Sequence, residues 1–263
     1  MIRFLAWLVV SLLTYGVLCF LLTLLYAVTR LKFVHKMMWF LYQHWINQLV
    51  KHAKRHIPDI ETHLNFDGVK GPYLIIANHY SWLDILIIYT ALTSVTPGFV
   101  FVMKRSLIKM PMIGIICWGL GHPMMRKSRK RIGRRLANHI TLEVAAKEAR
   151  QHEYGIMIFP EGTRYNIHSY RKSHYQNLMN PKYSGLNILH EAMQPITVID
   201  ITLAYEKHSH TIKDFLFKRV GGVKVYAEQF NLGALEIESW LQDRWLKKDQ
   251  LLTQIQYQHP ITG

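Results

Sequence analysis

The chain has 263 residues and a mass of 30.9 kDa, which suits one sizeable domain with its own core plus a short appendage. Its net charge of +15 and its isoelectric point near 9.8 predict an acidic partner, such as nucleic acid, an anionic membrane face or a phosphorylated substrate. The two cysteines, Cys19 and Cys117, exclude a disulfide framework and fit a reducing compartment, and the scattered histidines show no zinc spacing, so we predict no metal site.

The amino-terminal segment is apolar. No side chain between Arg3 and Arg30 is charged, and residues 4–28, at about 1.5 Å per residue, are long enough to cross a hydrocarbon layer of roughly 30 Å. The segment lacks the cleavage pattern of a signal peptide. Basic residues gather after it, so the positive-inside rule places the main body on the cytoplasmic side of an inner membrane. A helix lying along or inside one leaflet is the alternative.

A second amphipathic helix is predicted over residues 35–56, where apolar side chains recur at helical spacing until Pro58. Its aromatic residues resemble the belt that membrane proteins place at the lipid interface: Trp39, Tyr42 and Trp45. We therefore expect a membrane anchor with an interfacial helix over residues 1–57, and one catalytic domain over residues 58–263.

A strand predicted over residues 73–76 carries His79 just past its carboxyl end. Helix is expected to begin near Ser81 as an N-cap, so that Asp84 lies in or near the first turn. From there the carboxylate of Asp84 can reach one imidazole nitrogen of His79, fix its tautomer and leave the other nitrogen free as a base. Taken alone, His79 is more typical of a satisfied histidine in a strand-to-helix loop.

Further elements follow in alternation. Residues 99–103 predict a strand, residues 104–118 short helical pieces, and Met124 with Met125 a short strand that ends in the basic run 126–131. Positive charge at a helix amino terminus opposes the macrodipole, so this run suggests an anionic partner, with a solvated helix start as the alternative. A long amphipathic helix is predicted over residues 132–151.

A second polar turn follows the strand predicted over residues 155–159. It places a carboxylate, a hydroxyl and a guanidinium on residues 161–164. Because ligands of parallel sheets bind where the carboxyl ends of strands meet, we expect this turn and the His79 loop to share one crevice. The alternation of strands and helices predicts an α/β fold with a mostly parallel central sheet flanked by helices.

The rest of the chain begins with a polar stretch over residues 165–182, which is longer than an ordinary connection and is therefore predicted to be functional or mobile. The remaining predicted elements are a helix over 185–192, strands over 196–203 and 223–226, and a carboxyl-terminal helix over 235–256.

The ordered pair Asn78-His79-x-x-x-x-Asp84 and Phe159-Pro160-Glu161-Gly162-Thr163-Arg164 resembles the glycerophospholipid acyltransferase family, in particular the 1-acyl-glycerol-3-phosphate acyltransferases. The resemblance covers roughly residues 64–205. It implies that His79 acts as general base on a glycerol hydroxyl while Asp84 orients it, without a covalent acyl-enzyme. It also implies a set of acceptor-binding residues: Glu161, Gly162, Thr163 and Arg164.

The phosphate of a lysophosphatidic acid acceptor suits arginine, whose planar fork pairs bidentately, so Arg164 is the first candidate. The family's Gly-x-x-Phe-Ile-x-Arg block fits imperfectly here. Aligning it on Gly121 places Lys127 at the basic position, whereas aligning it on the arginine selects Arg126, and both stay candidates for phosphate binding. For Glu161 and Arg164 a local ion pair at the turn is the alternative.

The predicted function is thus a membrane-bound acyltransferase that moves a fatty acyl chain from acyl-CoA or acyl carrier protein to lysophosphatidic acid on an anionic phospholipid membrane, without a further cofactor. An enzyme that remodels another lysophospholipid, such as lysophosphatidylglycerol, is the near alternative, and a hydrolase that activates water is a more distant one. Gly-x-Ser-x-Gly does not occur, so a serine nucleophile is not predicted. No nucleic-acid partner is predicted, because the basic residues lack aromatic interleaving.

Overall fold

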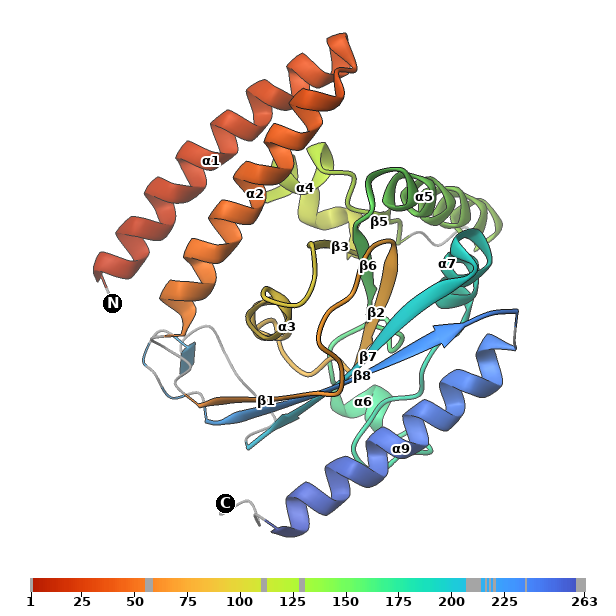
Figure 1. The fold of residues 1–263 in the computed structure, drawn as a ribbon. Helices are drawn as coiled ribbons and strands as arrows, with labels where there is room; N and C mark the ends of the chain where they lie inside the picture. Colours follow the sequence, from red (N-terminus) through yellow and green to blue (C-terminus); the bar gives the residue numbers. More distant parts are fainter. Residues whose placement is uncertain are drawn as a thin grey trace.

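A central sheet forms the middle layer of the molecule (Figure 1). The computed structural model describes residues 2–54, 59–109, 113–127, 131–206, 214–215, 217, 219, 221–234 and 236–258. The described strands of the sheet are, in spatial order, β1 (Ile60–Leu64), β8 (Val223–Leu232), β7 (Ile196–Tyr205), β2 (Tyr73–Ala77), β6 (Gly155–Ile158) and β3 (Phe99–Phe101). β7, β2, β6 and β3 run parallel, and β8 is antiparallel to β7. The predicted fold class is confirmed.

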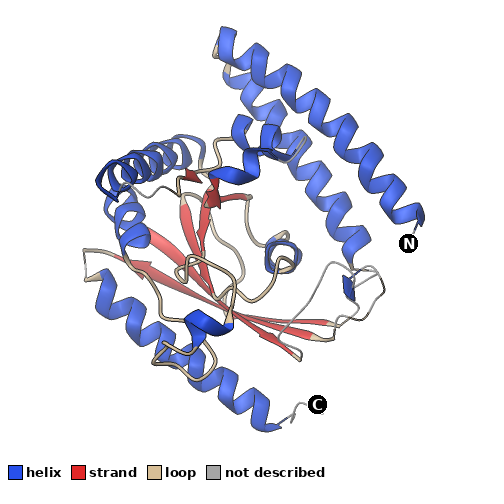
Figure 2. Ribbon diagram, turned by 180° about the vertical axis from the view of Figure 1, so that it is seen from behind, coloured by secondary structure: helices blue, strands red, loops and turns tan. Residues whose placement is uncertain are grey.

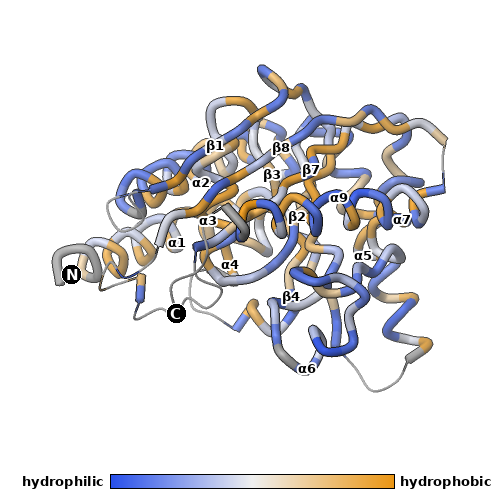
Figure 3. The backbone as a smooth tube through the Cα atoms, turned by 90° about the horizontal axis from the view of Figure 1, so that it is seen from below, coloured by the Kyte–Doolittle hydropathy of each residue, from blue (hydrophilic) through white to orange (hydrophobic). Residues whose placement is uncertain are grey.

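The central strands are apolar on both faces because helices cover both. Every residue of β2 and β6 is buried, which explains why these segments read as continuous apolar runs and not as alternating ones. Hydrophobic positions gather along the strands in the middle of the molecule (Figure 3). The two strands that lead into the polar turns, β2 and β6, therefore lie in the core of the sheet.

Helices cover the two faces of the sheet as separate layers (Figures 1 and 2). One layer consists of α5 (Arg131–His152), α7 (Ser184–Met193) and α9 (Ile237–Gln258). The other consists of α1 (Ile2–Thr29), α2 (Lys32–Ala53), α3 (Asp84–Leu92) and α4 (Ile113–Gly119). Two short helical pieces, η1 (Arg105–Lys109) and α6 (Ile167–Tyr170), lie in connections.

α1 and α2 pack side by side (Figure 1). The rings of Trp7 and His52 stack with centroids 3.8 Å apart, and the indole of Trp45 donates to Ser11 Oγ at 3.5 Å. Among the described residues, α1 contains the one helix segment that is long and apolar enough to cross a membrane, over Ala6–Thr29. Many of its large apolar side chains are exposed, which supports an association with lipid. The division between anchor and catalytic domain stays a prediction.

The helix expected from Ser81 begins at Asp84 instead. The carboxylate of Asp84 accepts the backbone N–H of Ser81 at 3.0 Å, and Ser81 Oγ accepts the N–H of Leu83 at 3.3 Å. These bonds close a tight turn before the helix. The prediction of Ser81 as N-cap was wrong. The carboxylate of Asp84 accepts the backbone N–H of Ser81 and at the same time contacts the imidazole of His79.

The strand predicted at Met124 and Met125 does not join the main sheet. These residues form β5 (Met124–Met125), which pairs in parallel with β4 (Met103–Lys104) in a separate two-stranded sheet. β4 follows β3 directly beyond its carboxyl end. β5 therefore brings the chain to the carboxyl edge of the main sheet.

The polar stretch over residues 165–182 is held against α9 at its later part. The carboxylate of Asp249 accepts the backbone N–H groups of Gln176 at 2.9 Å and Asn177 at 2.6 Å. The indole of Trp245 donates to Met179 O at 3.1 Å. These bonds favour a positioning function of the stretch over mobility.

Candidate active site

The two polar turns meet because β2 and β6 are neighbouring parallel strands in register. Ile76 of β2 pairs with Ile158 of β6, and three residues beyond each lie His79 and Glu161. The backbone N–H of His79 donates to Glu161 Oε2 at 3.1 Å, and the N–H of Tyr165 donates to His79 O at 2.7 Å. The two turns therefore meet at one edge of the sheet, as expected, and their sharing of a ligand crevice stays a prediction.

The imidazole of His79 is held from two sides. Its Nδ1 lies 2.7 Å from Asp84 Oδ2, and its ring stacks on Phe159 with centroids 3.8 Å apart and planes 12° apart. The side chain of His79 is 16% exposed and that of Asp84 is fully buried. No described residue hydrogen-bonds Nε2 of His79, so this nitrogen is available to a ligand. An oriented imidazole with one free nitrogen is the geometry of a general base.

Asp84 has a further partner that sequence reasoning missed. The hydroxyl of Tyr205, the last residue of β7, donates to Asp84 Oδ1. Burial first, and then the negative charge of Asp84, raise the pKa of Tyr205 well above its usual range, so the phenol remains a donor. The alternation of residues along β7 was the available signal. Tyr205 follows the inward apolar positions 199, 201 and 203, on the face that α3 covers.

Glu161 is a buried strut between segments. The residue as a whole is 3% exposed. Its Oε2 accepts the N–H of His79, and its Oε1 accepts the N–H of Met179 at 3.4 Å. Burial raises the pKa of Glu161 to about 8, although these two backbone hydrogen bonds act in the opposite direction. The ion pair between Glu161 and Arg164 that we had considered is not formed. That Glu161 and Arg164 bind the acceptor stays a prediction. Glu161 itself contacts the backbone of the loop that carries His79.

The turn after Glu161 needs its glycine. Gly162 has φ of +72°, in the left-handed region, and a Cβ at this position would lie 3.1 Å from Lys182 Nζ. The ammonium of Lys182 donates to Glu161 O at 3.0 Å. Lys182, which we had read only as part of the polar stretch, therefore adds a cation to the predicted acceptor site.

Thr163 and Arg164 complete the turn. Thr163 is half-buried, whereas Arg164 is exposed. Within the described part of the chain the guanidinium of Arg164 forms no hydrogen bond or ion pair, so all of its donors are available to a ligand. Its neighbour Tyr165 bonds the His79 loop. The backbone next to Arg164 therefore lies beside the loop that carries His79.

Arg126 and Lys127 are both exposed and follow β5 at the carboxyl edge of the sheet. The backbone of Arg126 is fixed to α5, since its N–H donates to Asn138 Oδ1 at 2.8 Å and its O accepts from Asn138 Nδ2 at 3.2 Å. No described contact joins either side chain to the His79 loop or to Arg164. The choice between the two as phosphate ligand stays a prediction.

Asn78 anchors the loop that carries His79. Its side-chain amide donates to Leu203 O at 2.9 Å and accepts the Leu203 N–H at 2.8 Å. This two-point contact extends the pairing of β2 with β7 by one residue after the strand has ended. The loop that carries His79 is therefore fixed on both sides, by β7 and by Glu161.

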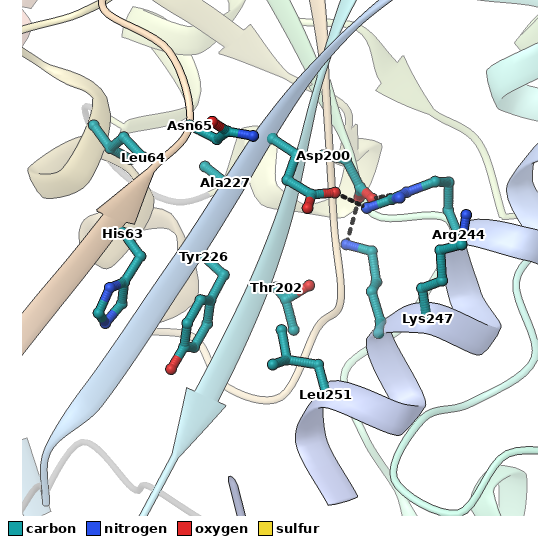
Figure 4. Close-up of a pocket in the computed structure, with 12 residues that line it drawn as sticks. His63, Leu64, Asn65, Asp200, Thr202, Tyr226, Ala227, Arg244, Lys247 and Leu251 are labelled. Atoms are coloured by element: carbon teal, nitrogen blue, oxygen red, sulfur yellow. Dashed lines mark hydrogen bonds and ion pairs between the residues drawn. The ribbon is translucent and has the colours of Figure 1, made fainter. Parts of the chain in front are cut away.

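A solvent-open groove of about 530 Å³ lies elsewhere, on the face of β7 that α9 covers (Figure 4). Asp200, which lines it, is held by Arg244 Nε at 2.6 Å and Lys248 Nζ at 2.5 Å. None of the predicted site residues lines this groove. The buried carboxylate of Asp200 is thus already paired with both buried cations of the groove.

In the described part of the chain, no group of three or more His, Cys, Asp or Glu side chains is placed to hold a metal ion. The site contains the imidazole of His79 and the carboxylate of Asp84, and the second turn carries the cations Arg164 and Lys182. This arrangement can remove a proton from a bound hydroxyl group next to an anionic substituent.

The chain thus has a mostly parallel α/β sheet with a hydrogen-bonded His–Asp pair at its carboxyl edge. The sequence profile of the family described as Acyltransferase matches residues 29–206, which is more than half of the chain. The chain belongs to the Acyltransferase family, and it is an acyltransferase.

A solved structure supports the same fold. The crystal structure of the 1-acyl-sn-glycerophosphate (LPA) acyltransferase PlsC from Thermotoga maritima superposes with a TM-score of 0.57. The match covers 92% of this chain and 96% of that chain, at 16% sequence identity. A search among curated protein sequences gives no significant match.

Proposed function

We propose that the protein transfers a fatty acyl chain from an acyl thioester, acyl-CoA or acyl carrier protein, to the free hydroxyl of 1-acyl-sn-glycerol-3-phosphate, giving phosphatidic acid. The observation that carries the proposal is the pair His79 and Asp84, joined at 2.7 Å with Nε2 free beside a turn that presents Arg164. A base and a cation on one edge suit an acceptor that has both a hydroxyl and a phosphate.

The chemistry follows from the arrangement of His79. Its Nε2 takes the proton of the acceptor hydroxyl as the oxygen attacks the thioester carbonyl carbon. Asp84 stabilises the imidazolium that forms, and Tyr205 and the Ser81 N–H hold the carboxylate in place. The tetrahedral intermediate then collapses, the carbon–sulfur bond breaks, and the thiolate leaves with the proton from His79.

In this proposal the acceptor binds to the second polar turn, residues 161–164. Arg164 pairs with the phosphate, Gly162 lets the backbone bend toward it, and Arg126 or Lys127 adds positive charge from the β5 end. Glu161 keeps the two turns at a fixed separation through its bonds to the backbone N–H groups of His79 and Met179. The acceptor hydroxyl would then meet the imidazole while its phosphate stays on the arginine.

The proposal places the enzyme on an anionic phospholipid membrane, with its catalytic domain on the cytoplasmic side of the inner membrane. The apolar α1, with its exposed side chains, and the net charge of +15 support this location. Lysophosphatidic acid, as a single-chain lipid, is delivered from such a surface. No cofactor besides the thioester donor is part of the mechanism.

The test is release of thiol from an acyl thioester by the purified full-length protein, with product lipids identified by mass spectrometry. The proposal predicts phosphatidic acid, with release that depends on lysophosphatidic acid. Acylation of lysophosphatidylglycerol in its place would favour the remodelling enzyme. Release without any lysolipid would indicate a hydrolase and contradict the proposal.

A further inference from the structure

The outer face of α5 carries an unexplained stripe of aliphatic side chains. They recur every four residues and are largely exposed: Ile132 (86%), Leu136 (62%), Ile140 (50%) and Val144 (55%). The inner face of the same helix uses other positions, among them Leu142, Ala145 and Ala149, which are buried. Since these two sets point in nearly opposite directions, the stripe is not part of the core. At about 1.5 Å per residue it is roughly 18 Å long.

The chain around the start of the stripe is strongly and uniformly basic. Residues 126–142 contain seven arginines and lysines and no acidic residue. Arg135, in the first turn of α5 after the stripe begins, is exposed and forms no ion pair within the described residues. An aliphatic stripe next to a cluster of basic residues is the composition of a helix that lies in the surface of an anionic bilayer.

The position of the stripe relates it to the active site. α5 follows Arg126 and Lys127, which lie at the carboxyl edge of the sheet, the same edge that carries His79. α5 lies on the outside of the molecule in both views (Figures 1 and 2). The end of the helix where the stripe is most exposed, at Ile132, is therefore the end nearest the catalytic edge.

We propose that the stripe Ile132, Leu136, Ile140 and Val144 inserts into the headgroup region of an anionic leaflet and forms a second membrane contact, separate from α1. A second copy of the chain does not suit this surface, because two such basic patches repel one another. Nucleic acid does not suit it either, because the exposed stripe is aliphatic. The inference rests on the proposed lipid substrate, since docking through α5 would place the catalytic edge at the leaflet that holds the acceptor.

The test uses the full-length protein with a polarity-sensitive dye on a cysteine introduced by Leu136→Cys. The matched control is Leu246→Cys on α9, which is similarly exposed at 51%. The native Cys19 and Cys117 are buried, and the labelled wild-type chain measures any background from them. Each protein is bound to vesicles of phosphatidylcholine alone or mixed with phosphatidylglycerol, some of which carry a headgroup-level quencher.

The proposal predicts a blue-shifted, quenched dye at position 136 on anionic vesicles, reversed by salt, and no change at position 246. A dye at 136 that stays in water while α1 holds the protein on the vesicles would overturn it. A response to an acidic acyl carrier protein but not to vesicles would also overturn it and identify a donor-docking surface. These readouts need no turnover, so they fail independently of the proposed reaction.

A functional variant completes the test. The double substitution Leu136→Gln and Ile140→Gln should leave turnover in detergent micelles unchanged and lower turnover on anionic vesicles several-fold. The control Leu246→Gln should change neither. Equal vesicle turnover by the double variant and the wild type would contradict a docking role for the stripe.

Discussion

The variant Glu161→Gln should be less stable than the wild type at low pH and more stable at high pH. Folding raises the pKa of this carboxyl from an ordinary 4.5 to about 8. Between those values the unfolded chain has released the proton and the folded chain still holds it. The unfolded state therefore binds fewer protons, and the contribution of Glu161 to stability falls as pH rises through this window.

The full change corresponds to about 5 kcal/mol, at about 1.4 kcal/mol per pH unit. The substitution has a cost of its own. Glu161 accepts from the backbone N–H groups of both His79 and Met179, and the hydroxyl oxygen of the protonated acid can still accept a hydrogen bond. The NH2 group of glutamine cannot accept, so one of these buried donors loses its partner at about 1 to 3 kcal/mol. Glu161→Gln should therefore be less stable than wild type at pH 5 and more stable at pH 8.

Thermal unfolding of both proteins in the same detergent, at intervals from pH 5 to pH 8, measures this difference. For a chain of this size each 1 kcal/mol shifts Tm by about 2 to 4 °C, so the crossing is readily detected. Glu191→Gln, at an exposed position on α7, is the control and should track the wild type. A constant Tm difference across the pH range would refute the reasoning.

Three further predictions concern single contacts in the site. Tyr205→Phe removes the O–H donor to Asp84 and should lower kcat roughly tenfold. It should also move the acidic limb of the pH–rate profile to higher pH. An unchanged profile would indicate that Tyr205 is purely structural. Arg164→Lys loses bidentate geometry and should raise KM for the phosphorylated acceptor much more than KM for the thioester; equal effects would indicate a structural role. Gly162→Ala, at φ of +72°, should lower stability by about 1 to 2 kcal/mol in denaturant unfolding, and an unchanged midpoint would contradict the strain argument.

The sequence was sufficient to predict the elements whose signals are local. The continuous apolar runs of β2 and β6 exist because both faces of those strands are covered, and each strand leads into a polar turn at the same edge of the sheet. The separation of His79 from Asp84 correctly predicted their hydrogen bond. These features depend on residues close together in the chain.

Other parts of the site depend on contacts between residues far apart in the chain, and local sequence patterns do not specify these partners. Tyr205 meets Asp84 across 121 positions of sequence, and only the pairing of β7 with β2 brings them together. Met179 donates to Glu161 and also accepts from Trp245 of α9, so this contact joins three separate segments of the chain. The start of α3 at Asp84 was also missed. Ser81 is typical of an N-cap, and the sequence does not show that the carboxylate of Asp84 accepts its backbone N–H.

The central claim is that His79 removes the proton from the acceptor hydroxyl, and turnover of His79→Ala tests it most directly. The measurement is thiol release from an acyl thioester with saturating lysophosphatidic acid, on protein whose circular dichroism and Tm match the wild type. We predict a fall in kcat of about a hundredfold or more, the usual contribution of a positioned general base. Turnover of His79→Ala at a near wild-type rate would contradict the account.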